Sequence, residues 1–378
     1  MDIRIPKTGL LSDGDQKYSG VEARFCHISW QLQQQDPSKV PMFRDLQDQS
    51  TLCTSTMYSV DLWDVARKAS DYDDRTHEFA ATTPRPGQGA VKPTAVVFHQ
   101  TRCGSTLIAN VLAAFNPEKS RVYTESPPPV AALKACDYDR ICDEGAQEAL
   151  IQDVFYLMGR VHEHKAGKFV FYKIQSVGVQ NINAFTRAMP DTPWIFAYRD
   201  SVEIMMSHFK NYQAGKELDA NPQAVCLRNY KKPNQPALLS RLVSEKGRTL
   251  ESLNPEEYCA AHLATLAESA VREYQLDPHS KTKRWFLNYK DLPFKVWEQI
   301  LPALVGPVRE SQINHMHHIS KSYSKGRGPK AGMHFHEDST VKQSRAPESV
   351  KAAVSLFLDP SFQTMEKLRK HIETRRGG

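Results

Sequence analysis

The sequence predicts an α/β protein whose parallel sheet is flanked by helices. Short apolar runs alternate along residues 95–210 with amphipathic segments long enough to be helices. A strand followed by a helix and a second strand is the usual unit of a parallel sheet, because the helix carries the chain back to the same edge. A chain of 378 residues is long enough to bury a large core.

The elements can be assigned in order along the chain. Strands are expected where apolar residues run together, at residues 95–98, 121–124, 169–174, 194–198 and 284–289. Helices are expected at residues 105–115, 146–162, 181–188, 201–210 and 255–274, and again from Glu348 onward. Asn254 followed by Pro255 is a good helix start, since asparagine caps a helix and proline suits its first turn.

The two ends of this alternation differ in composition. Residues 1 to about 80 are polar and weakly periodic, with one amphipathic stretch at 62–69, and the Pro- and Gly-rich residues 81–94 are typical of a linker. We therefore expect an N-terminal extension of unclear fold over residues 1–90 and the main domain over 91–378. Residues 211–253 are predicted to be irregular.

Composition excludes several function classes. Hydrophobic residues make up 40% and charged residues 24% of the chain, as in a soluble globular protein. The net charge of +6 suits a polyanionic ligand, but the basic residues are spread out and form no tail for nucleic acid. No apolar run approaches the roughly 18 residues of a membrane span, and the first residues lack the apolar core of a signal peptide.

The seven cysteines leave the compartment open. Three pairs have spacings at which they could join in an oxidising lumen: Cys26 with Cys53, Cys136 with Cys142, and Cys226 with Cys259. The chain has no Asn-x-Ser/Thr sequon, which disfavours a glycosylated secretory product. The default expectation is a reduced, cytoplasmic protein, and the alternative is a Golgi-lumen protein that is missing its anchor.

The strand at 95–98 leads into a segment that is suited to hold a phosphate, Arg102-Cys103-Gly104-Ser105-Thr106. Gly104 allows a sharp turn and close approach of an anion, and Ser105 and Thr106 open a helix with free N–H groups. Arg102 adds a fixed positive charge. The segment lacks the Gly-Lys-Ser/Thr ending of a nucleoside triphosphate loop. The plain alternative is a helix that merely begins after a glycine turn.

The same pattern returns at residues 194–209. Arg199 ends the strand, and Ser207 follows eight residues later inside the next helix. If the turn between strand and helix brings the arginine side chain back to the hydroxyl, the two can clasp a second phosphate. The alternative is that Arg199 forms a local ion pair with Asp200 and that Ser207 has no ligand.

Together, the two segments resemble sulfotransferases that use 3′-phosphoadenosine 5′-phosphosulfate (PAPS). The resemblance implies a P-loop NTPase-like fold, PAPS as co-substrate and no metal. It implies that residues 102–106 bind the 5′-phosphosulfate and that Arg199 and Ser207 bind the 3′-phosphate. It covers residues 95–370 and leaves residues 1–90 unexplained.

Two weaker motifs extend the resemblance. The segment WFLNYKDL is similar to a family strand whose tyrosine lies near the adenine, which implies that role for Tyr289. The segment SKGRG is similar to a family loop over the 3′-phosphate, which implies a role for Lys325 or, in another register, Arg327.

The resemblance leaves the general base to be found. The family's cytosolic branch carries Lys-Thr-His on its middle strand, where this chain has Lys173, an isoleucine and Gln175. Glutamine cannot take up a proton at neutral pH. We therefore expect Glu125, which follows the strand at 121–124 and precedes three prolines that stiffen its loop, to be the base, with Arg102 stabilising the leaving group. His208 is the substitute candidate.

Other functions are kept open. A P-loop kinase or NTPase lacks its lysine here, and a non-catalytic nucleotide-binding module would bind without turnover. A metal oxygenase is suggested by His315, His317 and His318, and by His336 with Asp338. The acceptor is expected to be a small alcohol, a glycan or a tyrosine, in a pocket built from residues 127–145 and 211–253. The oligomeric state is not predicted.

Overall fold

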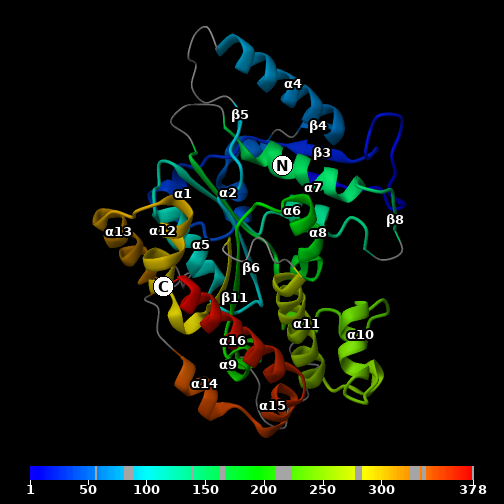
Figure 1. Cartoon of the computed structure of the whole chain (residues 1–378), viewed down its shortest axis with the longest axis vertical. Coiled ribbons are helices and arrows are strands. Elements are labelled where there is room, and N and C mark those ends of the chain that lie inside the picture. The colour runs from blue at the N-terminus through cyan, green and yellow to red at the C-terminus, as the bar shows by residue number, and fades with distance from the viewer. Residues whose placement is uncertain are drawn as a thin grey trace. The chain divides into compact units, whose positions relative to one another are not determined.

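The computed structural model describes residues 1–55, 58–80, 89–137, 140–161, 167–209, 224–276, 283–322, 333 and 338–376. The chain divides into two compact units, whose helices and strands are labelled in Figure 1. Unit 1 comprises residues 1–97, 106–194 and 293–335, and unit 2 comprises residues 98–105, 195–292 and 336–378.

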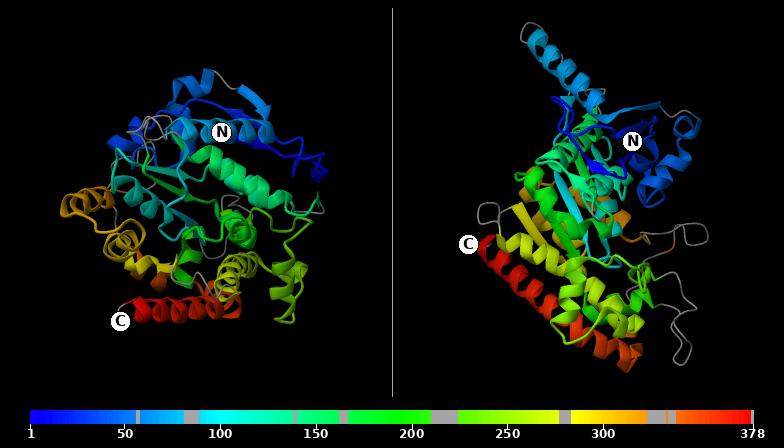
Figure 2. Two further views of the ribbon diagram at one scale, coloured as in Figure 1. Left: turned by 45° about the horizontal axis from the view of Figure 1, so that its top comes forward. Right: turned by 90° about the vertical axis from the view of Figure 1, so that its right-hand side faces the viewer.

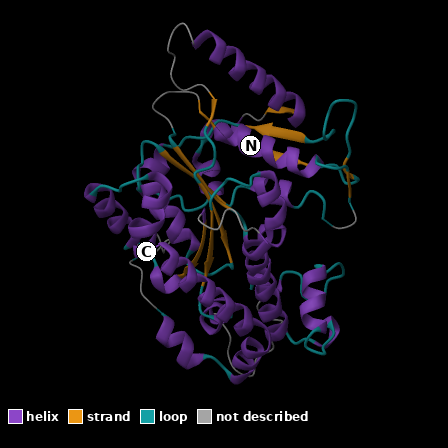
Figure 3. Cartoon of the chain, in the orientation of Figure 1, coloured by secondary structure: helices purple, strands orange, loops and turns teal. Residues whose placement is uncertain are grey.

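A five-stranded sheet confirms the predicted α/β fold class. Its strands follow the order β12 (Arg284–Asn288), β11 (Trp194–Tyr198), β6 (Ala95–His99), β10 (Phe169–Lys173) and β7 (Ser120–Thr124), which Figure 3 shows in orange. Strand β10 pairs in parallel with both β6 and β7, and Lys173 lies in register with Val97 on one side and Thr124 on the other. Strands β10 and β7 therefore end level with each other, and β6 continues two residues further, to His99.

The helices of unit 1 follow the predicted alternation, with one addition. Helices α6 (Pro127–Leu133), α7 (Ala146–Gly159) and α8 (Ile182–Ala188) pack against one another. The three prolines that were expected to stiffen a loop instead begin α6, with Ser126 at its N-cap. This placement is favourable, because the first turn of a helix needs no N–H donors and proline fixes a helical φ.

Residues 1–80 belong to unit 1. They form an antiparallel sheet of β1 (Asp2–Arg4), β3 (Glu22–Phe25) and β4 (Tyr58–Asp61), and the helices α1 (Gln31–Gln35), α2 (Phe43–Gln49), α3 (Thr51–Ser55) and α4 (Leu62–Ala80). Helix α4 packs on α7 and is longer than the predicted stretch 62–69. Asp153 of α7 accepts a hydrogen bond from Tyr18 at 2.7 Å and forms an ion pair with Arg67.

Gln33 of α1 covers the edge of the five-stranded sheet. Its amide donates from Nε2 to the carbonyl of Val122 at 2.9 Å and accepts at Oε1 from the Val122 N–H at 3.1 Å. Trp30 packs edge-on against Tyr123, which stacks on Tyr172. Because an open strand edge is a template for aggregation, the N-terminal residues protect β7 as a further strand would.

Unit 2 is mainly helical outside its strands. It contains α9 (Ser201–His208), α10 (Ala237–Ser244), α11 (Pro255–Leu276), α14 (Ser339–Arg345), α15 (Glu348–Ala353) and α16 (Asp359–Arg376). Helix α11 packs on α10, α15 and α16, as the views in Figure 2 show. Its predicted start at Pro255 is confirmed, and α10 corrects the expectation that residues 211–253 are irregular throughout. Residues 210–223 lie outside the described part of the chain.

The remaining elements are short. Strand β2 (Gly9–Leu10) pairs with β8 (Ile141–Cys142), and β5 (Gly89–Ala90) pairs with β9 (Arg160–Val161). Helices α12 (Leu301–Val305) and α13 (Glu310–Ser320) lie in unit 1. Gln312 and His315 of α13 contact the carbonyls of Phe115 and Ala114, at the end of α5 (Ser105–Ala114). They satisfy carbonyls that the end of a helix leaves unpaired.

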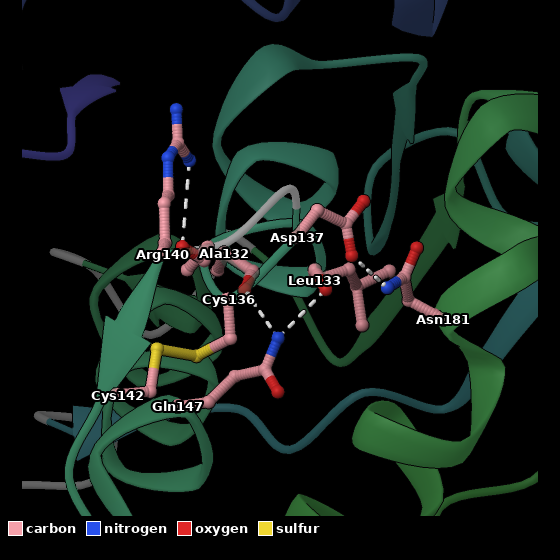
Figure 4. The surroundings of a disulfide bond; sticks show 9 residues. Ala132, Leu133, Cys136, Asp137, Arg140, Cys142, Gln147 and Asn181 are labelled. Atoms are coloured by element: carbon pink, nitrogen blue, oxygen red, sulfur yellow. Dashed lines mark hydrogen bonds between the residues drawn. A yellow bond between two sulfur atoms is a disulfide. The ribbon is translucent and has the colours of Figure 1, made fainter. Parts of the chain in front are cut away.

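Six of the seven cysteines form disulfides, so the expectation of a reduced chain is wrong. The three bonds are the pairs expected for an oxidising lumen: Cys26–Cys53, Cys136–Cys142 and Cys226–Cys259. Cys103 is buried and is not part of a disulfide. Figure 4 shows Cys136–Cys142 beside Gln147, whose amide donates to the carbonyl of Leu133 at 2.7 Å.

Candidate functional site

The segment after β6 has an unusual backbone. Thr101 (φ 63°) and Arg102 (φ 46°) are both left-handed, Gly104 (φ 79°) is left-handed as well, and α5 begins at the next residue. Non-glycine residues rarely adopt this conformation, and such strain persists only where the surroundings hold it. The Thr101 N–H donates to His99 Nδ1 at 3.1 Å, and the Cys103 thiol donates to the carbonyl of Ala197 at 3.2 Å.

His208 and Gln100 fasten the same segment to the rest of unit 2. Thr101 Oγ1 and His208 Nε2 form a hydrogen bond of 2.7 Å, so the histidine expected as the substitute base touches the loop itself. Gln100 donates two hydrogen bonds, from its N–H to the Ala197 carbonyl at 3.0 Å and from its side-chain amide to the Leu263 carbonyl at 3.1 Å. The loop is therefore rigidly placed at the end of β6.

Two groups of the loop are available for a ligand. Thr106 is 2% exposed, and its hydroxyl has no hydrogen-bond partner among the described residues. The half-buried Arg102 side chain forms no ion pair with any residue that the structure describes. Leaving a buried hydroxyl unpaired costs about 1–3 kcal/mol, so a ligand that supplies the missing partner is favoured. The chemistry of the set, a cation and hydroxyls at a helix start, suits an anion.

Three predicted positions from distant parts of the sequence meet at Tyr289. The Arg199 guanidinium carbon lies 4.0 Å from the centre of the Tyr289 ring. A Cβ atom on Gly104 would lie 2.7 Å from Tyr289 Cδ2 and 2.8 Å from Leu292 Cδ1, so only glycine leaves room for the ring. The ring thus contacts both the loop and the strand-end arginine.

Arg199 is a buried cation with anionic partners. Its side chain is 5% exposed, and it donates from Nε to Glu203 at 2.6 Å and from Nη2 to Asp338 at 2.9 Å. Burial alone would lower the pKa of Arg199, but the hydrogen bonds to Glu203 and Asp338 raise this pKa above its ordinary value. Asp200 is otherwise engaged, because its carboxylate caps α9 by accepting from the Val202 and Glu203 N–H groups.

Ser207 lies one helical turn beyond Glu203 and donates from Oγ to the Glu203 carbonyl at 2.9 Å. Residues four apart share one face of a helix. Glu203 therefore links Arg199 and Ser207, the pair predicted to bind a phosphate, and its own role was missed. The spacing of four residues between Arg199 and Glu203 was the signal that could have revealed it.

Glu366 of α16 connects the ends of β11 and β12, the strands that precede Arg199 and Tyr289. Its Oε1 accepts from Tyr198 at 2.6 Å and Asn288 at 2.7 Å, and its Oε2 accepts from Lys290 at 3.1 Å and Arg369 at 2.9 Å. Burial opposes the charge of this carboxylate, but the hydrogen bonds from Arg369 and its other partners hold the pKa well below the usual range. We infer that Glu366 positions the residues that follow these strands, Arg199 and Tyr289.

The lowered pKa of Glu366 makes stability depend on pH. The carboxylate stabilises the fold fully above its unfolded pKa, which is near 4.5, and this contribution is lost as pH falls toward the lower folded pKa. We expect the Glu366→Gln variant to lose about 1.5–3 kcal/mol of unfolding free energy at pH 7. Its deficit relative to wild type should shrink as pH falls below 4.5.

Urea denaturation at several pH values measures both quantities. Glu373→Gln is the matched control, since Glu373 lies on the same helix and also pairs with Arg369. A deficit of Glu366→Gln that stays constant between pH 7 and pH 3 would refute the assigned cause.

Gly104 offers a second prediction with its own control. We expect Gly104→Ala to lower the free energy of unfolding by about 1–3 kcal/mol more than a control substitution does, because its Cβ would press on Tyr289. Gly247→Ala is the control, since it introduces the same change at φ +67° with no atom within 4 Å of the added Cβ. Equal unfolding free energies of the two variants, measured by urea denaturation, would show that the contact with Tyr289 is unimportant.

Glu125, in unit 1, has a left-handed backbone and is held by contacts with Lys173 and Gln175. It is left-handed (φ 58°), its N–H donates to the Lys173 carbonyl at 2.7 Å, and its carboxylate forms an ion pair with the fully buried Lys173 ammonium. Gln175 donates from Nε2 to the Glu125 carbonyl at 3.2 Å. Glu125 therefore lies beside Lys173 and Gln175, two of the middle-strand residues considered above. The ion pair between Glu125 and Lys173 was not predicted from the sequence.

Some predicted residues lie outside the described chain. They are Lys325 and Arg327 of the segment SKGRG, and His336 of the suggested metal motif. His317 packs edge-on against Trp297. No group of three or more potential metal ligands occurs among the residues that the structure describes.

Comparison with known proteins yields only distant similarities. No protein-family model and no curated protein matches the chain. Among solved structures, a sulfotransferase domain from the curacin biosynthetic pathway is similar at 13% identity and a TM-score of 0.38, covering 70% of this chain and 97% of its own. A sulfotransferase from Alicyclobacillus acidocaldarius is similar at 12% identity and a TM-score of 0.37, covering 74% of this chain and 96% of its own.

A third similar structure, a sulfotransferase from Mycobacterium avium, has 14% identity and a TM-score of 0.35 and covers 78% of this chain and 84% of its own. Scores this low do not establish a shared activity. The function proposed below therefore rests on the residues of the chain. None of the helices in the described ranges has the length and apolar character needed to cross a membrane.

Proposed function

We propose that this protein is a sulfotransferase that moves a sulfuryl group from PAPS to a hydroxyl of an acceptor. The observation that carries the proposal is the meeting of Gly104 and Arg199 at the ring of Tyr289, because the three residues belong to three separately predicted donor motifs. A chance similarity in one motif would not bring the others to the same place.

The residues suit the charges of this donor. Arg102, Cys103, Gly104, Ser105 and Thr106 would hold the 5′-phosphosulfate through backbone N–H groups, the free Thr106 hydroxyl and the guanidinium. Arg199 and Ser207 would hold the 3′-phosphate. The Tyr289 ring, with its face on Arg199, would lie against the adenine. Lys325 is proposed as a further 3′-phosphate ligand from the sequence motif.

The reaction is an in-line displacement at sulfur. The acceptor oxygen forms the new S–O bond as the bond to the bridging phosphate oxygen breaks, and adenosine 3′,5′-bisphosphate leaves. Negative charge develops on that bridging oxygen, and a cation such as Arg102 stabilises it in the transition state. We propose that Glu125 takes the proton of the acceptor hydroxyl. In this assignment the Glu125 carboxylate acts from its ion pair with Lys173.

Transfer itself is the test. We expect incubation with ³⁵S-labelled PAPS and a panel of small alcohols, glycans and tyrosine peptides to label one acceptor class and to release adenosine 3′,5′-bisphosphate in equal amount. Intact mass spectrometry identifies the acceptor by the added SO₃. Tight nucleotide binding with no labelled product from any class would instead indicate a non-catalytic binding module.

Both segments proposed for the acceptor pocket contain at least one disulfide-bonded cysteine. Cys136–Cys142 lies within residues 127–145, and Cys226 lies within residues 211–253 and is joined to Cys259 of α11. Disulfides persist in oxidising compartments and are rare in the cytosol. We therefore propose that the protein works in an oxidising compartment.

Thiol counting tests this proposal. We expect alkylation of the denatured, unreduced protein to modify one cysteine, Cys103, and alkylation after reduction to modify seven. Removing the Cys226–Cys259 bond with a double alanine substitution should lower the unfolding free energy by about 3–4 kcal/mol, because it frees the loop that the bond closes. Seven reactive thiols in protein prepared from its native source without reductant would contradict the proposal.

A further inference from the structure

One carboxylate oxygen of unit 2 lies between a buried cation, Arg199, and a largely buried one, Lys342. Asp338 Oδ1 accepts a hydrogen bond from Arg199 Nη2 at 2.9 Å and another from Lys342 Nζ at 2.7 Å. The side chains of Arg199 and Lys342 are 5% and 11% exposed, whereas that of Asp338 is 43% exposed. The anion is thus the outermost and most easily moved member of the three.

The first turn of α14 is fitted to Arg199 by more than this contact. Ser339 accepts from Arg199 Nη2 at 3.3 Å and donates to Glu203 Oε2 at 2.9 Å. Glu203 also accepts from Arg199 Nε. The helix that carries Lys342 is therefore placed by contacts that do not involve Asp338 and that would remain if its carboxylate moved away.

The two cations need an anion between them. Two partly desolvated positive charges that share one oxygen repel each other when that oxygen is removed, because the surrounding protein screens them less than water does. Asp338 supplies one negative charge at this point in the free protein. A phosphate monoester supplies up to two, with three terminal oxygens, and can engage an arginine fork and an ammonium at once.

We propose that Lys342 is a cationic ligand of the donor's 3′-phosphate in addition to Arg199 and Lys325, and that the phosphate takes the place of the Asp338 carboxylate. The inference rests on the proposed function, since it is there that Arg199 is assigned to the 3′-phosphate. Before the donor binds, the Asp338 carboxylate occupies the phosphate position and holds Arg199 and Lys342 in place. When the donor binds, the Asp338 side chain turns toward solvent.

Two substitutions with opposite expected effects test the inference. Lys342→Ala should weaken binding of adenosine 3′,5′-bisphosphate about tenfold or more and leave binding of adenosine 5′-monophosphate unchanged. Asp338→Asn should strengthen binding of the bisphosphate about threefold to tenfold, because the competing charge is gone. Lys351→Ala and Glu348→Gln are the matched controls, since these two residues form an ion pair on the neighbouring helix of unit 2. Titration calorimetry with both nucleotides gives the affinities.

The outcomes separate the inference from the function on which it rests. Equal affinity of the wild-type protein for the two nucleotides contradicts the proposed function, and the inference with it. A wild-type preference for the bisphosphate that Lys342→Ala leaves intact, or a weaker bisphosphate complex of a folded Asp338→Asn protein, overturns the inference alone. A melting temperature within a few degrees of wild type shows that each variant is folded.

Discussion

Replacing Glu125 with glutamine is expected to lower the rate of sulfuryl transfer by about 10²- to 10⁴-fold at saturating donor. Glutamine keeps the shape of the side chain but cannot accept the acceptor's proton. Affinity for adenosine 3′,5′-bisphosphate should stay near the wild-type value, because the proposed nucleotide ligands do not include Glu125. Single-turnover transfer and nucleotide titration measure the two quantities separately.

The buried Lys173 makes a control necessary. Glu125→Gln leaves the Lys173 ammonium without the Glu125 carboxylate. Breaking a buried ion pair costs about 3–5 kcal/mol of unfolding free energy. Asp153→Asn breaks an ion pair with Arg67 elsewhere in unit 1 and should lower the melting temperature without a comparable loss of transfer. If Glu125→Gln transfers within a few-fold of wild type while His208→Asn is inactive, the base is His208.

Replacing Arg102 with alanine is expected to lower kcat by about 10²-fold or more. The guanidinium is proposed to meet charge that develops only as the bridging oxygen leaves, so its loss acts on the transition state. Arg102→Lys should retain part of the rate, since it keeps the charge and loses the planar fork. Steady-state kinetics with varied donor gives kcat and KM for each variant.

Arg199 is expected to act on binding instead. Arg199→Lys keeps a cation against Glu203 and Asp338 but loses the fork, so the KM for the donor should rise while kcat changes little. Lysine is the more informative replacement, because alanine would leave the Glu203 and Asp338 carboxylates without their cation and would create a cavity. If Arg102 variants change mainly KM and Arg199 variants mainly kcat, the two assignments are reversed.

The parts of the site that the sequence predicted are those fixed by local chain geometry. A buried strand, a turn with Gly104 and a helix that begins at Ser105 follow one another within a few residues, so their order alone predicts the loop. Arg199 at the end of β11 follows from the same pattern. The parallel sheet is predicted because the strand–turn–helix pattern recurs along the chain.

Two of the contacts that sequence reasoning missed join residues far apart in the chain. Asp338 reaches Arg199 across 139 positions, and Glu366 reaches Tyr198 across 168. No local pattern predicts such pairs. The N-terminal residues illustrate the same limit, because the role of Gln33 is visible only once Val122 is known to lie on an edge strand. Helix α6 differs from the predicted loop because prolines suit both a turn and the first turn of a helix.

A thermal-shift comparison of two nucleotides tests the central claim most directly, because the cradle is proposed to bind a nucleotide through its 3′-phosphate as well as its 5′ group. Adenosine 3′,5′-bisphosphate is expected to bind at micromolar concentration and to raise the melting temperature, as any ligand of the native state does. Adenosine 5′-monophosphate should raise it clearly less at the same concentration. Equal shifts from the two nucleotides, or none from either, would contradict the account.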